Sequence, residues 1–287
     1  MLRAVIVVIL YVASVVGINA SEQDTISTSQ PLRPVTSAYM LETGSSNITD
    51  TYLTPLKYDG FDVAFQYERW QAMKFDPENW TMLLTAGIEL HKTDNPARNA
   101  TMWYLGANAS WGMTHRWQLP QHITLAAGGS TGIDIGCLYN SRNGNNPASA
   151  KAAWTINLTG YATWNVTISR LPITLRYQPT IPITGVFFSP DYGELYYEIY
   201  LGTNSGLAHM AWWGNYFKMV NLLTADLHLG NTSLRLGYRN NILSTKVNGI
   251  TTRMINHNFI LGLSGEWLSL SRRHSLDPTA KIISALY

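Results

Sequence analysis

The feature that most constrains the fold is an alternation of apolar and polar side chains that runs for eighteen residues, from 152 to 169. The even positions carry mainly apolar residues, among them Trp154, Ile156 and Trp164, and the odd positions are mostly Thr and Asn. A period of two places these sets on opposite faces of one β-strand. Strands of water-soluble domains usually have about 5–6 residues, so this length is typical of a membrane-spanning barrel.

Other segments repeat the pattern and add a second argument. The alternation recurs in 80–91 and 101–114, and four apolar side chains between 259 and 267 share one face. Trp154 and Trp164 lie on the same face, which places them about 25 Å apart along the axis of a barrel whose strands tilt by about 40°. That distance matches the lipid-facing band, whose two rims carry aromatic residues. The alternative is a β-sandwich that buries both tryptophans in its core.

Residues 1–20 have the pattern of a cleaved export signal. Arg3 supplies the positive charge, residues 4–16 form an apolar run, and Ala20 is a small residue at the expected cleavage point. The run is shorter than the roughly 20 residues that a membrane-spanning helix needs. We therefore expect residues 1–20 to be removed on export and the outer membrane to be the destination.

The composition excludes several other classes of protein. Charged residues make up 13% of the chain and the formal net charge is +2, so no nucleic-acid partner is expected. The single cysteine, Cys137, excludes an intramolecular disulfide framework and a multi-cysteine metal site. Cys137 is expected at the start of the longest external loop, and its role stays open.

The strand pattern predicts an all-β, transmembrane, antiparallel up-and-down barrel of about twelve strands over residues 21–270. Ten strands is the alternative, because 181–188 is the weakest of the predicted strands. Short turns are expected at one end of the barrel, near 71–79, 115–121, 170–171, 189–193 and 230–231. Longer connections are expected at the other end, at 44–60, 92–100, 136–151 and 203–216. The twelve segments are 37–43, 61–70, 80–91, 101–114, 122–135, 152–169, 172–179, 181–188, 194–202, 217–229, 232–246 and 252–270.

Two hairpins make the predicted register specific. A turn at Gly230-Asn231 brings Asp226 opposite Arg235 on one face of the sheet and apolar residues together on the other. A turn at Arg170-Leu171 brings apolar residues opposite one another in the neighbouring hairpin. The predicted pairs are Leu227 with Leu234, Ala225 with Leu236, Leu223 with Tyr238, His228 with Ser233, Ile168 with Ile173, Val166 with Leu175, and Trp164 with Tyr177.

The segment FFSPDYGELYYEIY, residues 187–200, stands out from the strand pattern. With the export signal and the strand layout, the chain resembles a Bacteroidetes-type family of exported proteins of unknown function. The resemblance implies an outer-membrane β-barrel of similar length and brings no assigned activity or catalytic residues. The segment 264–270 is similar to the last-strand signal read by the barrel-assembly machinery, which implies that machinery as a partner during biogenesis.

No catalytic, cofactor-binding or metal site is predicted. Asp226 and His228 lie two residues apart on the lumen face, and Arg235 opposite Asp226 favours a structural salt bridge over an acid–base pair. Barrels that hydrolyse lipid place a serine and a histidine on the outer face at the membrane rim, and no such set with consistent facing can be assembled from the sequence. Five further charged residues are expected to point inward, namely Glu68, Glu89, Arg176, Glu198 and Arg239, and their mixed signs predict a polar, partly plugged lumen.

These observations favour a monomeric outer-membrane barrel with a structural or narrow-channel role and no enzymatic activity. Two alternatives remain open: a barrel that hydrolyses lipid, and a soluble secreted β-sandwich that binds a ligand. Residues 271–287 form a tail that plugs the lumen, binds a periplasmic partner or stays disordered.

Overall fold

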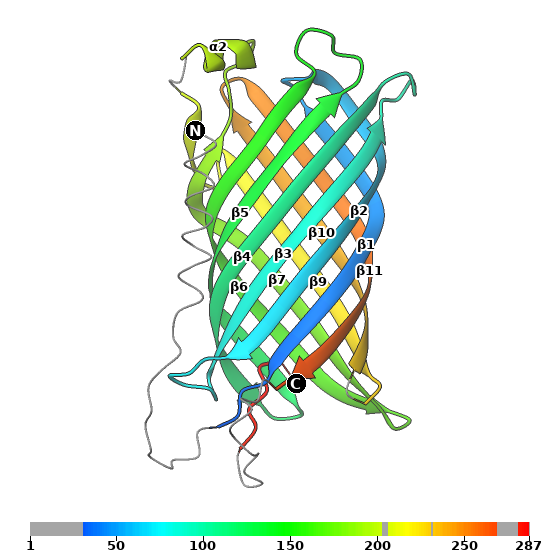
Figure 1. Ribbon diagram of the computed structural model, residues 1–287, viewed down its shortest axis with the longest axis vertical. Helices are drawn as coiled ribbons and strands as arrows, with labels where there is room; N and C mark the ends of the chain where they lie inside the picture. Colours follow the sequence, from blue (N-terminus) through cyan, green and yellow to red (C-terminus); the bar gives the residue numbers. More distant parts are fainter. Residues whose placement is uncertain (1–30, 203–205, 231, 269–280, 287) are drawn as a thin grey trace. The chain divides into compact units, whose positions relative to one another are not determined.

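The structure is a computed structural model that describes residues 31–202, 206–230, 232–268 and 281–286. Most of it consists of long β-strands whose successive side chains point to opposite faces of the sheet (Figure 1). The expected signal peptide lies outside these residues. The strands that form the barrel wall are β1 (Val35–Asp50), β2 (Thr54–Ala72), β3 (Trp80–Asp94), β4 (Thr101–Leu119), β5 (Ile123–Asn140), β6 (Ala148–Ile168), β7 (Leu171–Phe188), β9 (Tyr216–His228), β10 (Thr232–Val247) and β11 (Ile250–Trp267).

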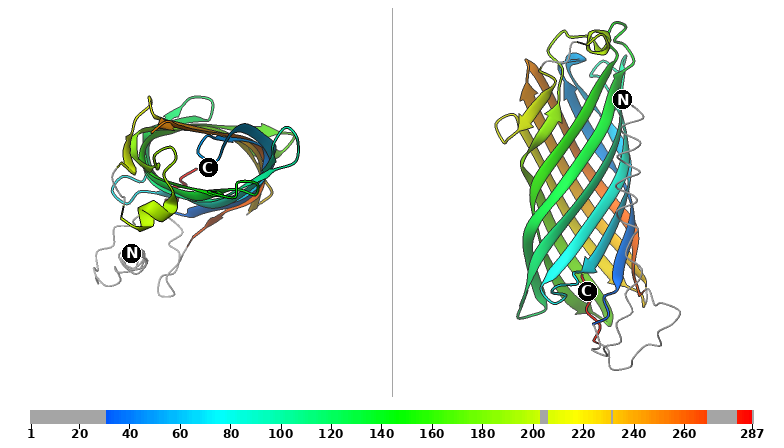
Figure 2. Two further views of the ribbon diagram at one scale, coloured as in Figure 1. Left: turned by 90° about the horizontal axis from the view of Figure 1, so that it is seen from above. Right: turned by 60° about the vertical axis from the view of Figure 1, so that its left-hand side comes forward.

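These ten strands close into an antiparallel barrel. Neighbours in sequence are neighbours in the sheet, β7 pairs with β9, and β1 pairs with β11 to complete the ring, which is seen along its axis in Figure 2. A short eleventh strand, β8 (Ala208–Ala211), pairs with the end of β7. The all-β barrel is therefore confirmed, and the ten-strand alternative is the observed one.

The predicted twelve strands are wrong in two places. Segments 172–179 and 181–188 are one strand, β7, because Pro179 and Pro182 both keep an extended backbone and stay beside their neighbours in the sheet. Segment 194–202 contains a short helix, α2 (Tyr196–Tyr200), in place of a strand. Residues 189–193 consequently join the connection to β8 at the end opposite the short turns.

The predicted register is correct in one hairpin and shifted in the other. The β9–β10 hairpin has every predicted pair, including Asp226 with Arg235. In the β6–β7 hairpin the turn is Ser169-Arg170, so Trp164 faces Leu175 where Tyr177 was predicted. Both turn residues have positive φ, 48° and 80°, which non-glycine residues rarely adopt. The shift is two residues, so every side chain keeps its predicted face.

The barrel is apolar outside and polar inside. Trp154 and Trp164 are 46% and 49% exposed on the outer surface, whereas Arg176 and Arg235 are almost fully buried within the lumen. This is the reverse of a sandwich, whose core would bury the tryptophans, so the β-sandwich alternative is wrong. Cys137 lies within β5 and is exposed beside outward-facing Ile135 and Tyr139, so it does not begin a loop. Among the described residues, no helix is long and apolar enough to cross a membrane.

Candidate functional site: the barrel lumen

The lumen is crossed by a cluster of four charged side chains near the end that carries the short turns, which is the end expected to face the periplasm. This ion-pair cluster consists of Glu68 on β2, Arg176 on β7, Asp226 on β9 and Arg235 on β10. Glu68 Oε2 accepts hydrogen bonds from Arg176 Nη2 at 2.8 Å and from Arg235 Nη1 at 2.7 Å. Since β2 and β7 lie on opposite sides of the ring, the Glu68–Arg176 pair spans the lumen and braces the barrel.

The alternation of the strands explains how these residues come together. Each of the four occupies an inward position in its strand, and all are at most 2% exposed. Arg235 binds Asp226 through two parallel hydrogen bonds of 2.6 and 2.7 Å. The predicted salt bridge between Asp226 and Arg235 is thus present. Two arginines match two carboxylates, so the cluster is neutral as a whole and its buried charges are paired.

Three further ion pairs of Lys or Arg lie in the lumen at other levels, and the first joins Arg239 on β10 to Glu42 on β1 at 3.0 Å. Lys218 on β9 lies 2.7 Å from Asp134 on β5, three strands away around the ring. Lys151 on β6 lies 2.6 Å from Asp50 on β1, on the opposite side of the ring. The expectation of inward charges of mixed sign is confirmed for Glu68, Glu89, Arg176 and Arg239, which line the cavity or belong to the lumen ion pairs. It is wrong for Glu198, which lies on α2 and accepts a hydrogen bond from the Leu195 backbone at that helix's start.

A serine, a histidine and a glutamate meet in the lumen wall, which the sequence did not reveal. Ser46 Oγ lies 2.8 Å from His91 Nδ1, and His91 Nε2 lies 3.2 Å from Glu89 Oε2. The residues come from β1 and β3, and only the intervening β2 brings them together. Ser46 and His91 are fully buried, and neither lines the lumen cavity. The arrangement is therefore a hydrogen-bond network without a path for substrate, and it gives the lipid-hydrolase alternative no support.

The imidazole ring of His228 contacts two hydroxyl groups, one at each ring nitrogen. Its Nδ1 lies 2.7 Å from Ser233 Oγ, and its Nε2 lies 2.9 Å from Thr174 Oγ1. These contacts fix the imidazole ring between β7 and β10 near the periplasmic end. The arrangement fits the structural role that was expected for this part of the lumen face.

A cavity of about 200 Å³ lies between the ion-pair cluster and the outer end of the barrel. Its wall is formed by residues of β2 to β7 and β9 to β11. Most of the residues in its wall are polar, with amides and hydroxyls such as Gln178, Asn241 and Thr155. Apolar side chains gather on the side of β7 and β9, where Phe187, Tyr216 and Leu243 are in contact.

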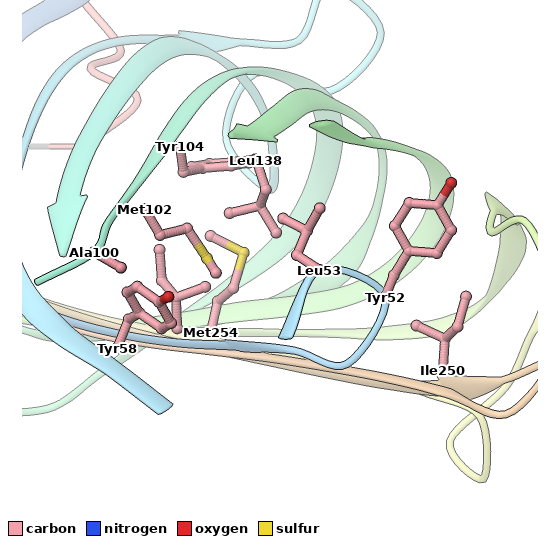
Figure 3. Close-up of a cluster of buried hydrophobic side chains, with 10 residues drawn as sticks. Tyr52, Leu53, Tyr58, Ala100, Met102, Tyr104, Leu138, Ile250 and Met254 are labelled. Carbon is pink, nitrogen blue, oxygen red and sulfur yellow. The ribbon is translucent and has the colours of Figure 1, made fainter. Parts of the chain in front are cut away.

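The outer end of the lumen holds an apolar cluster, shown in Figure 3. Leu53, from the turn between β1 and β2, packs with inward-facing Met102, Leu138 and Met254. This outer apolar cluster consists of Ile48, Tyr52, Leu53, Tyr58, Ala100, Met102, Tyr104, Leu138, Ile250 and Met254.

The loop that carries α2 packs against this cluster. The rings of Tyr52 and Tyr196 meet edge to face at 5.9 Å, and the Ala150 backbone N–H donates to Tyr196 Oη at 2.6 Å. Burial raises the pKa of Tyr196 to about 12, because the ionised phenol would lose its hydration there. The contacts between this loop and the cluster are therefore apolar or uncharged, and the Lys151–Asp50 ion pair lies beside them in the wall.

The periplasmic end of the lumen is occupied by residues 281–286 of the tail. Arg116 Nη1 donates to the carbonyl oxygens of Ser284 at 2.8 Å and Ala285 at 3.1 Å. Leu286 is 6% exposed and belongs to a cluster with Trp70 and Tyr161, whose rings meet edge to face. This tail cluster consists of Trp70, Leu83, Ala126, Tyr161, Ala285 and Leu286.

The part of the chain that the structure describes contains no group of three or more His, Cys, Asp or Glu side chains that could hold a metal ion. The similarity to a last-strand signal at 264–270 lies partly outside the described residues. Its described part ends β11, where Trp267 pairs with Val35 of β1.

Comparisons with known proteins give a family without an assigned activity. No curated protein matches the chain. Among solved structures, the chain is similar to the translocator domain of the autotransporter NalP from Neisseria meningitidis, with 13% identity over 92% of this chain and 96% of that one and a TM-score of 0.41. It is also similar to the outer membrane protease OmpT from Escherichia coli, with 7% identity over 85% and 99% of the two chains and a TM-score of 0.45. A third similar structure is the β domain of the Bordetella autotransporter BrkA, with 9% identity over 82% and 100% and a TM-score of 0.38.

These structural similarities carry no argument about activity for this chain. The family comparison is more informative, because its match extends over residues 4–274, nearly the whole sequence. It says nothing of the source organism, so a Bacteroidetes origin stays a prediction. The chain belongs to DUF3316, a family described as proteins of unknown function.

Proposed function

We propose that this protein is a monomeric, integral outer-membrane β-barrel that acts as a narrow passage closed at rest. The observation that carries the proposal is the cavity within the lumen, which is bounded by a different closure at each end. The apolar exterior supports insertion in lipid. The expected signal peptide and the barrel-assembly machinery as a partner in biogenesis belong to the same proposal. Catalysis is not part of it.

The periplasmic closure is the one that can be removed without disturbing the wall. Residues 281–286 belong to no strand of the barrel, and their polar contacts to it include the hydrogen bonds from Arg116 and the backbone bonds with Leu32. The braces above them are parts of the wall itself. The tail is therefore the element whose movement would open the lumen toward the periplasm. A periplasmic partner that binds the tail would act in this way.

The first experiment asks whether the protein is a membrane barrel. We expect it in the outer-membrane fraction and expect the unboiled protein to run at a different position from the boiled protein on an SDS gel, because a closed barrel resists unfolding by the detergent. Release by osmotic shock in soluble form, without a gel shift, would contradict the proposal.

The second experiment asks whether the tail closes the lumen. In planar lipid bilayers we expect the intact protein to show little steady conductance. Deletion of residues 281–287, combined with Leu53→Ala to weaken the outer apolar cluster, should produce a small steady conductance, because both closures must give way before ions can pass. Arg116→Gln in place of the deletion should have a weaker effect in the same direction, and Arg116→Lys should have less still. A large steady conductance from the intact protein would show that the lumen is not closed. No conductance from the variant in which both closures are weakened would exclude a passage and leave the structural role.

A further inference from the structure

One part of the barrel wall lacks its hydrogen-bond ladder. β7 pairs with β9 from Ile173–Leu227 up to Thr180–Val220, and it pairs with β8 from Gly185–Ala211 onward. Between these two ladders, residues 181–184 of β7 and 216–219 of β9 face each other without a paired register. On their other sides both segments are paired, with β6 and β10. We call this part of the wall the seam.

The seam arises from a four-residue insertion. Residues 212–215 leave the wall between β8 and β9 and form a tight turn, visible as the yellow segment that projects from the wall in the right-hand view of Figure 2. The Asn215 side chain fixes this turn, since its Oδ1 accepts from the Trp212 backbone N–H at 3.0 Å and its Nδ2 donates to the Met210 carbonyl at 2.9 Å. Without these four residues, β8 and β9 would continue one uninterrupted ladder along β7.

The chemistry of the exposed strand edge fits a lasting opening. Pro182 has no N–H to offer β9, and its carbonyl oxygen accepts a hydrogen bond from Trp213 Nε1. Unpaired backbone groups are costly against lipid and are tolerated where they line a cavity. The cavity reaches this place, because Thr180, Pro182, Tyr216 and Lys218 are all part of its wall.

The seam lies just below the outer aromatic rim. Val186 of β7 pairs with Trp154, which is the outer of the two tryptophans that span the lipid-facing band. Apolar side chains surround the seam on the lipid side, with Ile183, Met210, Trp212 and Trp213 between 51% and 71% exposed. A molecule in the outer leaflet therefore meets an apolar surface around the opening.

The inner side of the seam changes from apolar to polar with depth. Phe187, Tyr216 and Leu243 form the apolar cluster next to it. Farther in, the cavity wall includes Gln178 and Asn241, whose side-chain oxygens are buried and have no hydrogen-bond partner. Two unpartnered acceptors are satisfied by a group that donates hydrogen bonds, such as a hydroxyl.

We propose that the seam is a lateral opening through which the cavity takes up a single-chain amphiphile from the outer leaflet, with its acyl chain at the apolar cluster and a hydroxyl-bearing head group at Gln178 and Asn241. This inference rests on the proposed membrane barrel and names the class of molecule that its cavity accepts. The axial closures then keep water out, while the membrane side stays accessible.

The test is photo-crosslinking with a monoacylglycerol that carries a diazirine in its acyl chain, in liposomes. Labelled residues are identified by mass spectrometry, and the lipid-facing Phe217 serves as an internal reference for the lumen-facing Tyr216. For the intact protein we expect labels on Tyr216, Phe187 or Leu243 as well as on Phe217. The methyl ester of the same acyl chain, which lacks hydroxyl donors, should label the lumen less.

Deletion of residues 212–215 should close the seam and lower the lumen labels about tenfold relative to Phe217, which corresponds to about 1.4 kcal/mol. A point variant tests the same idea without changing the wall. Val220→Trp fills the cavity behind the seam and should also lower the lumen labels, whereas Met219→Trp, one residue away on the lipid side, should not.

The outcomes separate this inference from the proposed function. Suppose that the protein shows the gel shift and the tail-dependent conductance. If the lumen labels are then absent, or are as strong in the deletion and Val220→Trp variants as in the intact protein, the lateral opening is wrong and the barrel stands. If the intact protein shows no gel shift and no insertion, the proposed function itself fails.

Discussion

The two ends of the lumen are closed by opposite kinds of chemistry. At the periplasmic end, fixed charges meet in pairs, and Arg176 also lies 5.2 Å above the ring of Trp70. At the outer end, methionine, leucine and tyrosine side chains pack together, and one ion pair, Lys151–Asp50, lies beside them in the wall. Loss of one member of a buried ion-pair network is strongly destabilising, because it leaves a buried charge without its partner. An apolar cluster rich in methionine adapts to changes of shape. The comparison indicates a rigid inner end and a compliant outer end.

The largest effect is expected where the comparison is sharpest, at Glu68. Glu68→Ala removes the carboxylate shared by Arg176 and Arg235 and should lower the free energy of unfolding by about 3–5 kcal/mol. Glu68→Gln should also destabilise the barrel, since it leaves the same charge uncompensated. Urea unfolding followed by tryptophan fluorescence measures both. The control is Asp59→Asn, because the Lys57–Asp59 pair is exposed and contributes little. If the Glu68 variants are as stable as the control, the ion-pair cluster does not make its end of the lumen rigid.

A smaller effect is expected in the outer apolar cluster. Met254→Ala removes buried apolar volume and should cost about 2 kcal/mol. Met254→Leu preserves that volume and should cost less than about 1.5 kcal/mol. The same unfolding assay applies. If the leucine variant is as unstable as the alanine variant, the outer apolar cluster tolerates substitution no better than the ion-pair cluster, and the contrast between the two ends disappears.

The smallest effect concerns pH at the outer loop. Because burial raises the pKa of Tyr196 to about 12, the folded loop favours the neutral phenol. Its contribution to stability is complete below the ordinary tyrosine pKa, near 10, and is lost as the pH rises toward about 12. An ultraviolet titration of tyrosinate should show a late-ionising group that is missing in Tyr196→Phe. Ionisation of Tyr196 together with the exposed tyrosines would contradict the tight outer closure.

The sequence predicted the barrel well where local patterns decide the structure. The alternation in 152–169 gave the facing of Trp154 and Trp164, and a glycine-containing turn gave the β9–β10 register. The other hairpin was shifted because Ser169 and Arg170 adopt positive φ without glycine. The break expected between 172–179 and 181–188 is absent, because β7 stays beside β6 and β9 on either side of it. Local patterns carry no information on such support from distant parts of the chain.

The candidate site was only partly predictable for the same reason. The Asp226–Arg235 pair follows from one hairpin, and it was expected. The contact of Glu68 with Arg176 joins opposite sides of the ring, so it depends on the strand number and the closure of the barrel. The seam is recognised only when the pairing of β7 with β8 is compared with its pairing with β9. The docking of residues 281–286 requires the finished lumen. No spacing within the sequence shows these features.

The docking of the tail also sets an order of events during folding. The groups that hold residues 281–286 come from β2 to β6, from Leu32 and from Glu266 of β11, and the lumen that encloses them exists only after β1 has paired with β11. Residues far apart in sequence must meet for that pairing, which makes it a slow step. Residues 283–286 are therefore largely withdrawn from solvent at the end of assembly, and a protease that cuts accessible chain ends would remove them from unfinished barrels while sparing completed ones.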